Sequence, residues 1–284
     1  MKIPDHQRGL WITLAGIIAL SPDSLLVRLI PADQWTLLFW RGLLSGGGIA
    51  LLGIIFHGRD TPAAFRRIGK PGLVMAVVFS TSTILFVTAL HFTSVANTLI
   101  LAGTAPIFAA LLSRVFLSEQ VQVRTWITLL IVVASVTLIV SDNSDGHSLS
   151  GDLSALACAF LMALTFIITR RSRAHDMTPA MALSGFITAL VVLPFATPFA
   201  LSFDTALMLV LLGLLLAVAF ALLTIGPRYI TAPEVSMMMP LETVFGTLLV
   251  WLWVGEVPTV QAVIGGVIIV TALATHAALA LKNQ

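Results

Sequence analysis

Charged side chains are scarce in this chain. Asp, Glu, Lys and Arg make up 10% of its 284 residues, whereas about 25% is usual for a soluble domain. The formal net charge is +2, and the basic residues form short clusters between apolar runs, which argues against a nucleic-acid-binding surface. The composition therefore excludes an ordinary water-soluble globule, and we expect no nucleic-acid partner.

Residue patterns that carry chemistry are also missing. The single cysteine, Cys158, lies in an apolar run, so neither an intrachain disulfide nor a thiolate metal cluster can form. The sequence contains no His-Glu-x-x-His, no Gly-x-Ser-x-Gly and no P-loop with its lysine. We expect no enzyme activity, no catalytic residue, no metal and no cofactor. Without a nucleotide site, transport across a membrane would have to be driven by a gradient.

Apolar residues dominate instead. They make up 58% of the chain, and the mean hydropathy is +1.03. A helix that spans a bilayer needs about 20 mostly apolar residues, so the chain has room for about ten spans. The sequence predicts an all-α integral membrane protein with ten transmembrane helices, at residues 9–30, 35–56, 71–90, 95–116, 125–140, 153–169, 178–199, 205–230, 235–254 and 260–281.

The distribution of Lys and Arg predicts the orientation of the chain. These residues accumulate in short loops on the cytoplasmic side of a membrane. Ten spans with a cytoplasmic N-terminus place all but Arg28 and Arg41 of the fifteen basic residues on that side. Residues 10–20 resemble a signal-peptide core, but apolar sequence resumes at Leu25, so we expect an uncleaved first span. Both termini are predicted to be cytoplasmic.

An internal repeat relates the two halves of the chain. Residues 94–106 align with 231–243, and each stretch runs on through an apolar segment to a lone acidic residue, Glu119 or Glu256. Residues 9–28 and 151–170 match in the same order. Each half holds five predicted spans, and an odd number means that the second half enters the membrane from the opposite side. Inverted repeats of this kind are typical of secondary transporters.

Four short motifs identify a family resemblance. They are Phe39-Trp40-Arg41, Ala89-Leu90-His91 with Ser94-Val95-Ala96, Pro106 before Ser118-Glu119, and Pro240 before Gly255-Glu256. In these motifs, and over nearly its whole length, the chain resembles the drug/metabolite transporter (DMT) superfamily, in particular the EamA-like bacterial metabolite exporters. The resemblance implies two five-helix repeats, 1–142 and 143–284, around a central cavity, with the fifth and tenth helices outside it. Amino acids and their derivatives are among the substrates of this branch, although a single tyrosine, Tyr229, does not provide a tyrosine-rich cage.

Four charged residues in or beside the predicted spans are candidate coupling or gate residues: Asp23, Arg41, Glu234 and Glu242. A charge costs about 2.5 to 3.5 kcal/mol at the centre of a bilayer, so each needs a partner or water. Asp23 and Arg41 are both expected about 10 Å below the outer surface, at about 1.5 Å per residue, and can pair. For Arg41 we favour a structural ion pair, because its helix is expected outside the cavity lining. Glu234 begins a helix, where the dipole favours a carboxylate, and a cytoplasmic gate is the alternative.

Glu242 is the strongest single candidate. At about 1.5 Å per residue it lies about 12 Å into the membrane, near the midplane. Burial there disfavours the charged form, so the group could take up and release protons or pair with a substrate amine. The alternative is a neutral acid that hydrogen-bonds another helix.

The remaining candidates are helix breaks and cavity residues. Interruptions at Pro22, Gly103, Pro106 and Pro240 can present backbone polar groups to a ligand, although proline bends also serve packing. The predicted substrate-binding or cavity residues are Asp23, Trp40, His91, Asn97, Phe160, Phe220, Met238 and Glu242.

Taken together, the sequence predicts a secondary active transporter of the bacterial inner membrane that exports small polar metabolites by alternating access, with the proton as a candidate coupling ion. An uptake carrier of the same fold, for a vitamin or nucleotide derivative, is the nearest alternative. A lipid-handling membrane protein that does not transport is another, and it would have a groove open to lipid in place of a sealed polar cavity. The partners expected are a small-molecule substrate and the lipid bilayer, and the sequence leaves open whether the chain is a monomer or a homodimer.

Overall fold

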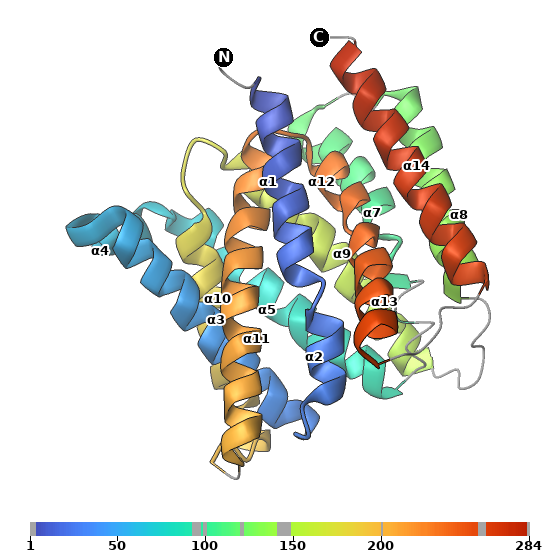
Figure 1. The fold of residues 1–284 in the computed structure, drawn as a ribbon. Helices are drawn as coiled ribbons and strands as arrows, with labels where there is room; N and C mark the ends of the chain where they lie inside the picture. The colour runs from blue at the N-terminus through green and yellow to red at the C-terminus, as the bar shows by residue number, and fades with distance from the viewer. Residues whose placement is uncertain are drawn as a thin grey trace.

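The structure is a computed structural model that describes residues 4–92, 98, 101–119, 122–140, 149–199, 201–254 and 260–282. Helix makes up 88% of it, and no strand occurs in the described ranges (Figure 1). This confirms the all-α prediction. The α-helices are α1 (Asp5–Leu20), α2 (Asp23–Leu29), α3 (Gln34–His57), α4 (Thr61–Arg67), α5 (Gly69–Phe92), α7 (Ala105–Leu112), α8 (Val123–Val140), α9 (Leu149–Arg171), α10 (Thr178–Val192), α11 (Phe203–Ile225), α12 (Ala232–Met238), α13 (Pro240–Val254) and α14 (Val260–Lys282).

Six apolar stretches among the described residues are long enough to cross a bilayer. They are Gln34–Ile55, Gly69–Ala89, Leu149–Arg171, Thr178–Phe195, Phe203–Arg228 and Ala232–Trp253. Shorter apolar helices cover Ala105–Leu117, Val123–Ser135 and Val263–His276. These helices make the chain a multi-pass membrane protein, although six clear spans do not establish the count of ten.

Helices break where the sequence places proline or glycine. The first predicted span divides into α1 and α2 at Ser21 and Pro22. The ninth divides into α12 and α13 at Met239, directly before Pro240. Gly103 lies in a turn that precedes α7, and Pro106 occupies the first turn of that helix. Proline lacks the N–H that would continue the helical ladder, which accounts for the breaks at these positions.

Helices from the two halves of the chain pack against each other throughout. Helix α1 packs on α11, α3 on α10 and α11, and α5 on α9 and α10, while α7 contacts α9 and α12. The last helix of each half, α8 and α14, form a pair of their own. Both chain termini lie at the same end of the molecule, at the top of Figure 1, and we refer to it as the termini end.

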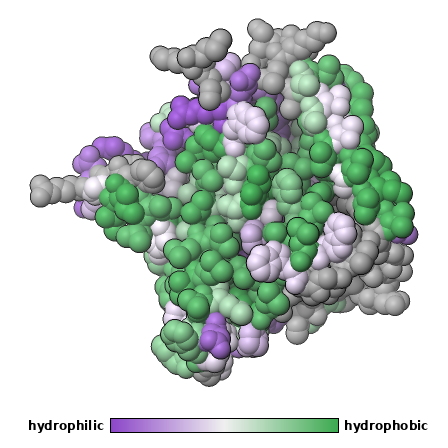
Figure 2. Space-filling model, viewed as in Figure 1, coloured by the Kyte–Doolittle hydropathy of each residue, from purple (hydrophilic) through white to green (hydrophobic). Residues whose placement is uncertain are grey.

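The surface is largely apolar. Figure 2 shows hydrophobic side chains over most of one face, with hydrophilic ones gathered mainly near its upper edge, at the termini end. Large apolar side chains point outward from many helices, among them Trp11 (65% exposed), Leu252 (75%) and Val267 (62%). An exposed apolar surface of this extent suits contact with lipid.

Glycines bring α3 and α10 into close contact. A Cβ atom placed on Gly42 would lie 2.7 Å from the carbonyl oxygen of Gly185, and one on Gly46 would lie 2.8 Å from that of Ala182. Gly42 and Gly46 form a Gly-x-x-x-Gly pattern, which allows membrane helices to approach closely. In the structure these glycines pack within the chain, between its two halves.

A methyl group at this crossing should destabilise the fold. We expect Gly42→Ala to lower the free energy of unfolding by about 1 to 3 kcal/mol, because overpacking of a tight contact costs this much. The matched control is Gly47→Ala on the same helix, where an added Cβ meets no atom within 4 Å. The melting temperature in detergent checks the comparison, and equal values for the two variants would contradict it.

Candidate functional site

An ion pair joins α2 to α3 inside the apolar body. Arg41 Nη2 lies 2.5 Å from Asp23 Oδ2, and each side chain is 11% exposed. Asp23 is the first residue of α2, directly after the break at Pro22, so its carboxylate also lies where a helix dipole favours negative charge. A pair this short and this buried offsets much of the cost of holding either charge away from water.

Glu242 is the third charged member of this site. It lies in the first turn of α13, which packs against α2, and it is mostly buried. Its carboxylate is within electrostatic range of both Asp23 and Arg41. The structure thus brings together three of the four charged residues that the sequence singled out, two from the consecutive helices α2 and α3 and one from the distant helix α13. We call Asp23, Arg41 and Glu242 the central charged site.

The hydrogen-bonding capacity of the central charged site is not fully used. Asp23 Oδ1 and Arg41 Nε are buried and have no hydrogen-bond partner in the described part of the chain. Two carboxylates and one guanidinium also carry one net negative charge when all are ionised. An unpaired buried polar atom costs about 1 to 3 kcal/mol, so both atoms favour a further partner.

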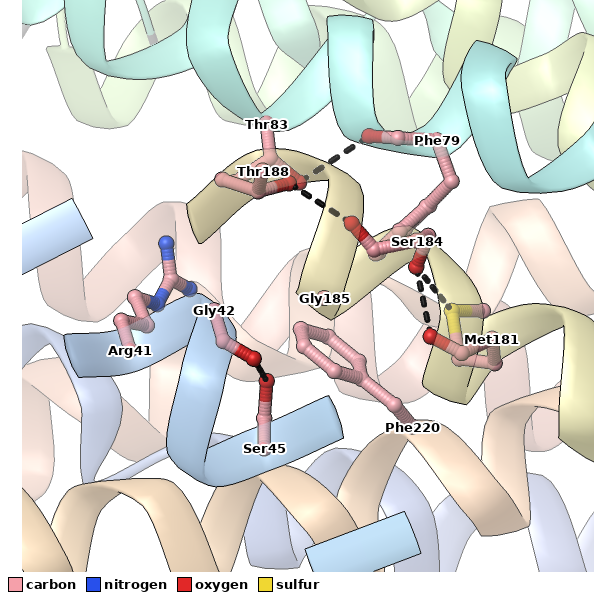
Figure 3. Close-up of a pocket in the computed structure, with 10 residues that line it drawn as sticks. All are labelled: Arg41, Gly42, Ser45, Phe79, Thr83, Met181, Ser184, Gly185, Thr188 and Phe220. Carbon is pink, nitrogen blue, oxygen red and sulfur yellow. Dashed lines mark hydrogen bonds between the residues drawn. The ribbon is translucent and has the colours of Figure 1, made fainter. Parts of the chain in front are cut away.

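A small cavity adjoins the site at Arg41 (Figure 3). Polar side chains from three helices line it, including Ser45 on α3, Thr83 on α5, and Ser184 and Thr188 on α10. The ring of Phe220 reaches from α11 between these helices and packs on Phe79 at 5.2 Å between ring centroids. The cavity has room for little more than a water molecule, so the site is closed to a metabolite in this conformation.

The helix of Arg41 takes part in the lining of this small cavity. We expected that helix outside the lining of a central cavity, and in the structure α3 contributes Arg41, Gly42 and Ser45 to the wall of this void. The close α3–α10 crossing explains the difference, because the glycines let the backbone of α3 reach the interior. Arg41 is therefore both a partner of Asp23 and a wall of the cavity.

The polar residues of α10 were missed from the sequence. The Thr188 hydroxyl donates to Ser184 O (2.9 Å) and lies within hydrogen-bond distance of Ser80 Oγ on α5 (3.0 Å). Their signal in the sequence is two hydroxyl residues four positions apart beside Gly185, in an otherwise apolar span. Hydroxyls of this kind usually bond their own helix, and so the pattern alone does not single them out.

Glu234 lies at the termini end, apart from the central charged site. Its Oε2 accepts hydrogen bonds from the Thr231 backbone N–H and hydroxyl, which completes a capping box at the start of α12. Its Oε1 lies 3.0 Å from His6 Nε2 on α1. The N-terminal capping role expected from the sequence is present, and the link to His6, 228 residues away, is additional.

The other predicted cavity residues are dispersed. The indole N–H of Trp40 donates to Pro198 O at 3.0 Å, and Phe160 packs edge-on against Phe108 at 5.8 Å between centroids. Met238 lies at the end of α12 and packs partly buried against core clusters. Phe220 lines the small cavity, whereas Trp40, Phe160 and Met238 are not part of its lining. The side chains of His91 and Asn97 lie outside the described residues.

A further ion pair, between Arg170 and Glu119, joins the two halves of the chain. Arg170, near the end of α9, donates through Nε to Glu119 Oε1 at 3.0 Å and through Nη1 to the carbonyl oxygens of Pro227 and Arg228, both at 3.3 Å. Ser113 donates to the other oxygen of Glu119 at 2.8 Å. In the sequence Glu119 and Arg170 end two different repeat segments, whose counterparts end at Glu256 and Arg28, and this pattern offers no reason to pair them.

Known proteins resemble this chain in sequence and in fold. The uncharacterized transporter YdfC of Bacillus subtilis is 31% identical over 179 residues, which cover 60% of this chain and 58% of that protein. The pseudopaline exporter CntI of Pseudomonas aeruginosa is 26% identical over 266 residues, with 91% of this chain and 93% of that protein covered. A crystal structure superposes with a TM-score of 0.85 over 98% of this chain and 99% of its own, at 19% identity, and so shows a likeness of fold alone.

The family profile that matches the chain describes the EamA-like transporter family. It matches twice, over residues 9–141 and over residues 149–276, and the two matches together cover most of the sequence. The chain therefore belongs to the EamA-like transporter family, within the drug/metabolite transporter superfamily.

Proposed function

We propose that the protein is a secondary active transporter that exports small polar metabolites, such as amino acids or related zwitterions, by alternating access. The observation that carries the proposal is the central charged site, in which Asp23, Arg41 and Glu242 meet within the apolar body. Ionisable groups inside a membrane protein mark a substrate or ion pathway by default, because burial makes them costly to keep.

The chemistry of the site suits a ligand that carries both charges. A substrate carboxylate would accept from Arg41 Nε, which has no partner in the described structure, and an ammonium group would donate to Asp23 Oδ1 or to Glu242. Hydrogen bonds that involve a charged group are stronger than neutral ones. A zwitterion would satisfy these atoms and leave the net charge of the site unchanged.

Alternating access requires two halves that can move around the site, and we assign ten membrane helices to two inverted repeats, 1–142 and 143–284. The helix contacts support this assignment. In this division α1 corresponds to α9, α3 to α10 and α5 to α11. Exchanging each helix for its counterpart turns the α1–α11 contact into the α9–α5 contact and the α3–α11 contact into the α10–α5 contact. All four contacts occur. The α3–α10 and α8–α14 contacts map onto themselves. The two matches of the family profile, one in each half, support the same division.

The direction of transport and the orientation of the chain belong to the same proposal. One relative of nearly equal length is named as an exporter, and the distribution of Lys and Arg favours cytoplasmic termini in a bacterial inner membrane. We assign the proton as the coupling ion and Glu242 as the residue that binds it, because within the described ranges no ion pair is formed by this carboxylate, while Arg41 pairs with Asp23.

Replacement of Glu242 tests the proposed function. Purified protein is reconstituted in vesicles loaded with isotope-labelled amino acids, and efflux is measured with and without a pH gradient. Glu242→Gln should abolish the efflux that the gradient drives while leaving substrate exchange partly intact, because glutamine cannot carry the proton. Asp204→Asn, which removes an exposed carboxylate at the start of α11, should transport normally.

Three results of this experiment would contradict the proposal. Normal gradient-driven transport by Glu242→Gln would place proton coupling elsewhere in the chain or remove it. Inward flux that depends on the protein, without protein-dependent efflux, would favour an uptake carrier. A protein that moves no labelled compound in either direction, but exchanges or modifies lipid, would favour the lipid-handling alternative.

The ion pair gives a separate prediction on stability. Asp23→Asn should lower the free energy of unfolding by about 3 to 5 kcal/mol, because it leaves the Arg41 guanidinium buried without its counter-charge. The double variant Asp23→Asn with Arg41→Gln should recover most of this loss, since neither charge then remains. Thermal unfolding in detergent measures both, with Asp204→Asn as the control. A double variant no more stable than the single one would contradict the pairing.

A further inference from the structure

Polar contacts between the two halves of the chain gather at the termini end, and three of them are made by residues of α1 and α9. His6 bonds Glu234, Arg170 bonds Glu119, and the guanidinium of Arg8 lies 5.0 Å from the ring centroid of Tyr229. Each contact has one partner in the first half of the sequence and one in the second. Movement of the halves apart at this end must break all three.

The His6–Glu234 contact differs from the other two in its chemistry. Arginine keeps its charge at any physiological pH, whereas histidine changes its charge near neutrality. The two side chains are 17% and 13% exposed, so water competes only weakly for the bond. A charged donor makes this bond to a carboxylate stronger than a neutral imidazole does.

Other titratable groups face His6 from the neighbouring helices. Arg124 on α8 and His276 on α14 are within electrostatic range of it, as is Glu234 on α12. His276 Nδ1 lies 3.2 Å from Thr128 Oγ1, and Arg124 Nη1 donates to Leu279 O at 2.9 Å. On α1 itself, Arg8 stacks on Tyr229. Glu234 is the anionic member of this group, so it is the partner that protonated His6 gains.

We propose that His6 and Glu234 form a proton-dependent latch that holds the termini end of the transport path closed, and that the latch weakens when His6 loses its proton. The inference rests on the proposed transport function and adds the regulation of one of its gates. It assigns a role to His6, whose side chain bonds a residue 228 positions away in the sequence.

The direction of the pH effect follows from the environment of His6, which precedes the predicted first span. The hydrogen bond to Glu234 raises the pKa of His6 above its ordinary value of 6.5, while burial and the Arg124 charge oppose this rise. A raised pKa in the closed form means that the latch is complete below the ordinary pKa and is lost as the pH rises through the raised value. Alkaline conditions at this end should therefore favour opening.

Labelling of a buried cysteine measures the opening directly. Ser236, two residues beyond Glu234, is fully buried, and its hydroxyl has no partner in the described structure. Cysteine is introduced by Ser236→Cys in the full chain after the native thiol is removed by Cys158→Ala. A membrane-impermeant maleimide is then applied from the termini side between about pH 5 and about pH 8, where histidine titrates.

His6→Gln provides the reference at each pH. Glutamine can keep a neutral hydrogen bond to Glu234 but does not titrate, so the ratio of the two labelling rates cancels the reactivity of the thiol itself. We expect the rate with His6, relative to His6→Gln, to rise about fivefold across this range, because a charged hydrogen bond is lost. His6→Ala should label faster than the parent at acidic pH, and His175→Gln, which removes an exposed histidine, should leave the profile unchanged.

Two results would overturn the latch. One is a labelling ratio that does not change with pH, and the other is a His6→Ala variant that labels no faster than the parent at acidic pH. Monodisperse elution in detergent checks that each variant is folded. Labelling reports opening and not flux, so failure of the latch is distinguishable from failure of the transport function, which the vesicle assay measures.

Discussion

The cost of burying charge in an apolar body governs the centre of this protein. Asp23 and Arg41 are each largely hidden from water, and each is tolerable there because the other lies 2.5 Å away. The pair fixes α2 against α3, and the break at Pro22 lets α2 begin with its carboxylate at a helix N-terminus. Glu242 places a second carboxyl group within electrostatic range of the pair. With all three groups ionised the site would carry one excess negative charge, which a proton or a cationic group would relieve.

The close approach of α3 and α10 has consequences for this charge balance. Glycines at the crossing let the backbones of α3 and α10 approach each other closely. This approach places Arg41 beside the hydroxyl groups of Ser184 and Thr188. Bulkier residues there would move the guanidinium away from the interior. The same contact joins the two halves of the chain, so the geometry of the site depends on how the halves pack.

The sequence predicts the class of the protein and part of its site, for identifiable reasons. Hydropathy marks the membrane helices because an apolar span is a property of consecutive residues, and proline marks the breaks because its chemistry is local. Asp23, Arg41 and Glu242 were found because charge is conspicuous in an apolar run. Thr188 and the His6–Glu234 bond were missed, since hydroxyls are common in membrane helices and since a contact across 228 residues has no signal in local pattern. The part that α3 takes in lining the small cavity was not foreseen, because packing distance, and not hydropathy, decides which helices line a cavity.

Two broken helices lie side by side and connect the centre to the termini end. The interruptions at Pro22 and Pro240 end the hydrogen-bond ladder, so α1 and α2, like α12 and α13, are separate rigid pieces. Helix α1 contacts α12, where His6 bonds Glu234, and α2 contacts α13, where Asp23 is within electrostatic range of Glu242. Each broken helix thus has one piece at the His6–Glu234 contact and one at the central charged site. The two pieces of each helix meet at a break and do not form one continuous helix. The contacts at the termini end can therefore separate without moving the central charged site as part of the same rigid helix.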